Sequence, residues 1–183
     1  MELLEILREK REAVADRWRE LVLETYPPQS VTFLGKEKDG FRNPVGATIR
    51  QAIGDLVEGL TGGADAGVLA GPLDALVRMR AVQGFSPGET VGFVFLFRRA
   101  LGDVLREELE TAPAGELLEL YARLDEMALA AWDRYAICRE KISEIRAREA
   151  TARTYSLLKR AGLLVEAFGA TETGTCSRAE GRS

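Results

Sequence analysis

The sequence contains no histidine at any of its 183 positions. Histidine titrates nearest to neutral pH and is the commonest general acid or base and a common metal ligand. Its absence excludes the usual serine and cysteine hydrolase arrangements, and also the proximal ligand of a globin-type haem. We therefore expect no enzymatic activity, no cofactor and no metal site.

Cysteine is scarce as well, because only Cys138 and Cys176 occur, far apart and without metal-ligand spacing. Two such cysteines make no disulfide framework and suit a reducing cytoplasm. No window approaches the 18 apolar residues that a membrane span requires, and the first twelve residues lack the apolar core of a signal peptide. The net charge of −4 disfavours nucleic acid as a partner. We expect a cytoplasmic protein with no membrane span.

Helical periodicity runs through the whole chain, since apolar residues recur at steps of three and four. The pair Pro27-Pro28 ends the first helix, and Asn43-Pro44 combines a capping residue with proline at the first helical position. The sequence therefore predicts an all-α fold of five or six helices. The expected helices cover about residues 2–25, 30–39, 44–60, 68–83, 87–109 and 115–160.

The start of the fifth helix carries a capping box, in which Ser86 caps and Glu89 reaches back. The following run, Val91 to Phe97, is apolar on every side, which places it in the middle of the fold. A strand is the alternative, because the run is rich in β-branched and aromatic residues. The capping box and the amphipathic continuation favour a helix.

The last predicted helix contains no proline or glycine after Gly115 and is long enough to extend beyond a domain of this size. It carries a seam with alternating steps of four and three, which is a heptad repeat. Met127 and Trp132 widen the apolar face near its start, so we expect this half to pack against the globular body. The seam consists of Leu117, Tyr121, Leu124, Ala128, Ala131, Tyr135, Cys138, Ile142 and Ile145.

The later part of this seam is a candidate dimer surface, because heptad seams pair helices. It comprises Tyr135, Cys138, Ile142 and Ile145. Cys138 is either a small packing residue or a redox contact across the dimer. Beyond Ile145 the helix is highly charged with both signs, which is typical of a solvated helix flank.

One group of side chains near the fifth helix is a candidate ligand cavity. Its polar members precede the capping box and could hold an anion, or pair with Glu89 as a purely structural group. Its aromatic members could line an apolar cavity, although such a run is more often simply core. The candidate residues are Arg78, Arg80, Gln83, Phe85, Phe93 and Phe97.

Three stretches resemble the N-terminal domain of RsbRD-type proteins, which are RsbT co-antagonists related to the stressosome sensor RsbR. They are Tyr26-Pro27-Pro28, Phe41 to Gly46, and Val77 to Pro87. The likeness covers about Glu2 to Ile145. It implies a non-haem globin-like sensory domain that dimerises through its terminal helices and acts in the stress response. The resemblance also implies that the long helix leads to an output STAS domain, and we expect this sequence to lack that domain.

The resulting expectation is a globin-like sensor domain over residues 1–145, a projecting helical arm over 146–162, and an apolar patch with a disordered tail over 163–183. The leading hypothesis is a stand-alone sensory domain that forms a homodimer and signals to a protein partner through its C-terminal helix or tail. One alternative is a binding module for a small ligand or cofactor. Another is an adaptor subunit that docks on a larger complex through Leu163 to Phe168.

Overall fold

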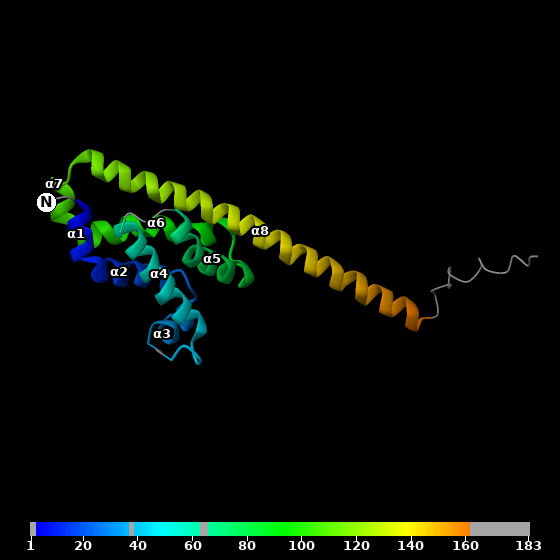
Figure 1. The fold of residues 1–183 in the computed structure, drawn as a ribbon. Coiled ribbons are helices and arrows are strands. Elements are labelled where there is room, and N and C mark those ends of the chain that lie inside the picture. Colours follow the sequence, from blue (N-terminus) through cyan, green and yellow to red (C-terminus); the bar gives the residue numbers. More distant parts are fainter. Residues whose placement is uncertain (1–2, 37–38, 63–65, 162–183) are drawn as a thin grey trace, which may run out of the picture. The chain divides into compact units, whose positions relative to one another are not determined.

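The computed structural model describes residues 3–36, 39–62 and 66–161. Within these ranges the fold is all-α, as predicted, and ends in a long helix (Figure 1). Two of the predicted helices are each divided in two. The helices are α1 (Leu3–Glu9), α2 (Arg11–Leu23), α3 (Pro28–Lys36), α4 (Pro44–Gly62), α5 (Ala66–Val82), α6 (Pro87–Val104), α7 (Arg106–Thr111) and α8 (Ala114–Arg160).

The first compact unit covers Met1–Ile142, and its centre is formed by α2, α4, α5 and α6. Trp18 of α2 is fully buried and contacts the rings of Phe93 and Phe97 on α6 at centroid distances of 6.1 and 4.9 Å. Its indole N–H donates to the Phe93 carbonyl at 2.7 Å, so the one polar atom of this side chain is satisfied inside the core. The apolar run of α6 is therefore helical and central, as predicted, and the strand alternative is wrong.

Two breaks divide helices that the sequence predicts as continuous. The first lies at Lys10, between α1 and α2, where the side chain reaches Glu108 on α7. The second lies at Leu105, between α6 and α7, where the backbone leaves helical geometry and the leucine is fully buried. Both breaks let short helices turn onto the same core, which a periodicity count along one straight helix cannot anticipate.

Asn43 joins α3 to α4. Its side-chain N–H groups donate to the carbonyls of Phe33 and Leu34 at the end of α3, and its carbonyl oxygen accepts from the backbone N–H of Gly46. The predicted cap of α4 is thus confirmed, and it also binds the preceding helix. Asn43 is buried, and a satisfied buried amide of this kind fixes the angle between two elements.

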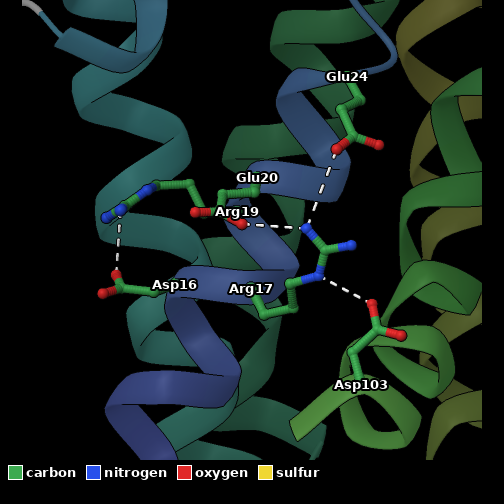
Figure 2. Close-up of polar contacts among 6 residues, drawn as sticks. All are labelled: Asp16, Arg17, Arg19, Glu20, Glu24 and Asp103. Carbon is green, nitrogen blue, oxygen red and sulfur yellow. Dashed lines mark hydrogen bonds and ion pairs between the residues drawn. The ribbon is translucent and has the colours of Figure 1, made fainter.

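An ion pair on the surface joins Arg17 of α2 to Asp103 of α6, and Figure 2 shows the group around Arg17. The Arg17 guanidinium contacts Glu20 at 3.0 Å on its own helix and Asp103 of α6 at 2.8 Å. The neighbouring pair Arg19–Asp16 lies within α2. Exposed pairs contribute little individually, so this network mainly complements a junction that the apolar core already determines.

The first part of α8 forms one wall of this unit and lies along α6 (Figure 1). Arg98 of α6 pairs with Asp125 of α8, and the start of α8 reaches α1 where Glu116 accepts from the Leu3 backbone N–H. The buried residues of α8 are Leu120, Leu124, Met127, Ala128, Ala131 and Tyr135. The prediction that this half packs on the body is therefore correct.

Trp132 departs from that prediction, because half of its side chain is exposed whereas Met127 is buried. Five residues advance a helix by about 500°, so two side chains at this spacing point some 140° apart and cannot share one face. Trp132 belongs to an outward side of α8 together with Leu118 and Leu129. These three residues are referred to below as the outer stripe.

The second unit begins at Ser143, and its described residues end at Ala161. Every described side chain in it is exposed, including those of Ile145, Tyr155, Leu157 and Leu158. The predicted patch at Leu163 to Phe168 and the predicted tail lie outside the described residues. None of the described helices is apolar over a length that would cross a membrane.

Candidate functional site

The C-terminal end of α5 carries a buried arginine, Arg80, whose side chain has no exposed surface. The helix ends in a Schellman motif, because the N–H of Gly84 donates to the Ala81 carbonyl and that of Phe85 to the Arg80 carbonyl. Gly84 has a φ of +88°, a left-handed conformation that favours glycine. This motif usually pairs two apolar side chains, one from the last turn and one beyond the glycine. Here Arg80 occupies the first of these positions and Phe85 the second.

Two aromatic rings enclose the Arg80 guanidinium. Its central carbon lies 4.6 Å from the centroid of Phe85 and 5.3 Å from that of Tyr26, and the two rings are 5.1 Å apart. Thr25 accepts a hydrogen bond from Nη2, and the Tyr26 hydroxyl donates to Gln83 at 3.3 Å. We call Thr25, Tyr26, Arg80, Gln83 and Phe85 the Arg80 cluster. It joins the end of α2 to the end of α5.

The positive charge of Arg80 has no matching negative charge among the described residues. Its Nε and Nη1 atoms are buried without a hydrogen-bond partner, and no carboxylate lies within ion-pair distance. Burial lowers the pKa of Arg80, and the nearby Tyr26 and Glu89 oppose that shift. Burial likewise raises the pKa of Tyr26, so its hydroxyl is neutral at physiological pH and supplies no counter-charge.

Glu89 is held at the start of α6 by the predicted capping box. Its carboxylate accepts from the Ser86 backbone N–H at 2.8 Å, and the Ser86 hydroxyl accepts from the Glu89 backbone N–H. The hydrogen bonds that this carboxylate accepts from Ser86, with Arg80 adding a smaller electrostatic effect, lower the pKa of Glu89. Arg80 and Glu89 therefore attract one another across a distance but do not form the direct ion pair that the structural interpretation proposed.

The Arg80 cluster is linked to α8 through Tyr135. The Tyr135 hydroxyl donates to the backbone carbonyl of Phe85 at 3.3 Å, and the tyrosine side chain is buried. Phe85 is thus held from two sides, by the guanidinium beneath its ring and by α8 at its carbonyl. A change in the position of Phe85 would change a contact of the long helix directly.

The six predicted ligand residues divide between two places. Arg80, Gln83 and Phe85 meet in the cluster, and Arg78 lies outside it, exposed and paired with Asp74 on its own helix. Phe93 and Phe97 are fully buried against Trp18. This packing favours the interpretation of Phe93 and Phe97 as core residues over that of a ligand cavity.

The four predicted seam residues also differ in their surroundings. Tyr135 is buried, Cys138 and Ile142 are partly buried, and Ile145 is 55% exposed. Cys138 packs against the core of its own chain. The start of the seam is therefore occupied within one chain, whereas its later residue Ile145 and the outer stripe are exposed.

Hollows on the surface of the first unit lie along α4. One of about 400 Å³ lies between α2 and α4, with Ala15 and Gly54 among the small residues lining it and Arg50 and Glu58 among the charged ones. Another, of about 590 Å³, lies between α4 and α5 beside Pro72. Charges of both signs surround the first hollow, so it has no evident preference for one class of ligand.

Sequence reasoning missed Thr25, Tyr26 and Tyr135 as members or neighbours of the cluster. Tyr26 was visible only as the residue before two prolines that end a helix, and Tyr135 only as a seam residue. Their contact with Arg80 and Phe85 depends on packing between residues that are 50 or more positions apart in the chain. A pattern of short-range spacings carries no signal for such a contact.

Comparison with known proteins identifies a family. The family model described as the RsbT co-antagonist protein rsbRD N-terminal domain matches residues 12–162. No curated protein and no solved structure matches the chain. The matched range includes the Arg80 cluster and α8 as far as its end. The chain belongs to the family of RsbT co-antagonist rsbRD N-terminal domains.

Proposed function

We propose that this chain is a sensory domain of stress signalling that forms a homodimer and passes its signal to a protein partner through α8. The family supports a regulatory role, since RsbT co-antagonists act on a signalling protein. A regulator of this kind would act in the cytoplasm, and we propose no catalytic function for it.

The observation that carries the proposal is the hydrogen bond from Tyr135 to the Phe85 carbonyl. It connects α8 to a buried charged cluster that the core does not need for its apolar packing. The same helix continues beyond the first unit to Arg160. A helix that packs in the sensing body and continues into an exposed segment can transmit a shift of the body to a partner bound at that segment.

The proposed dimer surface lies on α8. The outer stripe exposes Leu118, Leu129 and Trp132 by 68%, 69% and 50%, which is much apolar surface for one side of a helix. The predicted seam residues Ile142 and Ile145 lie on another side of the helix, since the sixteen residues from Leu129 to Ile145 turn it by about 160° beyond full turns. Pairing of two α8 helices along the outer stripe would bury its three side chains, in the manner of a helical seam between two chains.

Light scattering of the full chain at micromolar concentration tests the dimer. We expect twice the mass of one chain for the wild type and a monomer for Leu129→Glu, because a buried unpaired carboxylate opposes association. Val68→Glu is the matched control, since Val68 is exposed to a similar degree on α5. A wild type that is monomeric, or a Leu129→Glu variant that dimerises as well as Val68→Glu, would count against this surface.

The adaptor hypothesis remains a second proposal for the segment from Leu163 to Phe168. Its test is removal of the chain from Gly162 onward, followed by capture of partners from the native cell. Loss of one specific partner is the expected result if that segment docks. Unchanged capture would leave α8 as the docking element.

A further inference from the structure

The Arg80 guanidinium is a buried cation for which the described residues supply too little compensation. Its Nε and Nη1 atoms lack hydrogen-bond partners, and its Nη2 atom donates to the neutral hydroxyl of Thr25. The faces of Phe85 and Tyr26 attract the charge but cannot accept its in-plane N–H groups. Arginine keeps its proton in proteins, so the charge cannot be removed by titration. Such a group normally has an anionic partner.

The carboxylate that arginine would otherwise take is engaged elsewhere. Glu89 is close enough to influence Arg80 electrostatically, but its Oε2 atom accepts from the Ser86 backbone N–H in the capping box. Breaking that box to reach Arg80 would leave the first turn of α6 without its cap. The sequence thus places a buried cation near an anion that is held in the cap of α6.

We propose that the Arg80 cluster binds one small oxyanion, a carboxylate or phosphate group that accepts hydrogen bonds from the free N–H groups of Arg80. The planar guanidinium fork matches both kinds of group, and its charge makes those hydrogen bonds strong. The site deepens the proposed function, because it names the class of signal that the domain senses. Oxyanion binding itself does not require that the chain dimerises.

The ligand reaches Arg80 through the turn that follows α5. Gln83 and Gly84 are exposed there, and Phe85 is only partly buried above the guanidinium. Since Arg80 has no exposed surface, entry must displace the Phe85 ring. That displacement acts on the Phe85 carbonyl and therefore on its hydrogen bond from Tyr135 of α8.

Thermal unfolding of the full chain in a cationic buffer, with chloride holding ionic strength constant, tests the site. Sodium phosphate is one titrant and sodium acetate the other. At ten times the dissociation constant we expect a saturable rise of about 3–6 °C in the unfolding midpoint of the wild type. Arg78→Met should respond like the wild type, because Arg78 is exposed and paired with Asp74. Arg80→Met should show no saturable response.

Comparison of the wild type with the Arg78→Met and Arg80→Met variants tests whether the oxyanion binds at Arg80. A response to phosphate alone assigns a phosphate group to the site, and a response to acetate alone assigns a carboxylate. A midpoint that does not move in the wild type overturns the proposal. So does an equal, non-saturating rise in all three chains, which would be a general effect of salt on protein surfaces.

A second measurement on the wild type alone covers the case in which Arg80→Met does not fold. The side-chain Nε–H signals of arginine can be followed by nuclear magnetic resonance during the same titrations. We expect the Arg80 signal to shift to a plateau at the midpoint of the thermal response while that of Arg78 stays in place. An unchanged Arg80 signal would refute oxyanion binding even if the chain is a signalling dimer.

Discussion

At the scale of single residues, the contact between Asn43 and Gly46 shows why a particular glycine is required. A Cβ atom at Gly46 would lie 2.2 Å from the Asn43 side-chain nitrogen and 2.4 Å from the Leu34 carbonyl oxygen. Both atoms belong to the joint between α3 and α4, so the clash cannot be relieved by moving a flexible side chain. At Gly54, on the same helix, no atom lies within 4 Å of such a Cβ.

The two glycines therefore predict opposite effects of the same substitution. Gly46→Ala should lower the free energy of unfolding by about 1–3 kcal/mol, since an atom is forced into a filled space. Gly54→Ala should raise it by about 0.5–1 kcal/mol, because alanine restricts the unfolded chain and favours helix. Urea unfolding of both variants measures the difference. A Gly46→Ala protein as stable as Gly54→Ala would show that the joint is not rigid.

At the scale of elements, the capping box of α6 predicts a pH dependence. The pKa of Glu89 is lowered in the folded protein by its hydrogen bonds to Ser86. Because this pKa is lowered, the unfolded chain takes up the proton at a higher pH than the folded protein does. The stabilisation by the ionised Glu89 carboxylate is therefore complete above its ordinary pKa of 4.5. It is lost as the pH falls through the pKa that Glu89 has in the folded protein. Glu89→Gln keeps an acceptor without the charge. The difference in urea midpoint between this variant and the wild type should therefore be present at pH 7. It should vanish at a pH below the pKa of Glu89 in the folded protein.

Ser86→Ala tests the same element by a second route. Loss of the capping hydroxyl should cost about 1 kcal/mol of unfolding free energy, and it should also shrink the pH-dependent difference. Ser143→Ala is the matched control, because Ser143 is exposed within α8 and caps nothing. An unchanged stability of Ser86→Ala, or an equal loss in Ser143→Ala, would show that the capping hydroxyl does not stabilise α6.

Elements with local signals were predictable from the sequence, and those that depend on distant packing were not. The Asn43 and Ser86 caps and the central run of α6 follow from residues within a few positions of one another. The breaks at Lys10 and Leu105 depend on where α7 packs. For the candidate site, composition and position singled out Arg80, Gln83 and Phe85. Its other partners come from α2 and α8, and only the fold brings them together.

At the scale of the whole molecule, the first unit should fold by itself. No described residue after Ile142 is buried, and the compact unit that ends there contains the whole described core. We expect a chain of residues 1–142 to unfold with the same dependence on urea as the full chain, since that slope reflects the surface buried on folding. Its unfolding free energy should agree within roughly 1 kcal/mol, because the removed helix is exposed throughout.

Both chains should carry Leu129→Glu in this comparison, so that association through the outer stripe does not add to the measured stability. Circular dichroism during urea unfolding supplies the midpoint and the slope. A shallower slope or an early transition in the shorter chain would show that residues after Ile142 support the body, and the division of α8 into a core half and an exposed half would then be wrong. Equal curves would leave the segment after Ile142 free to contact a partner without a cost to the fold that carries the Arg80 cluster.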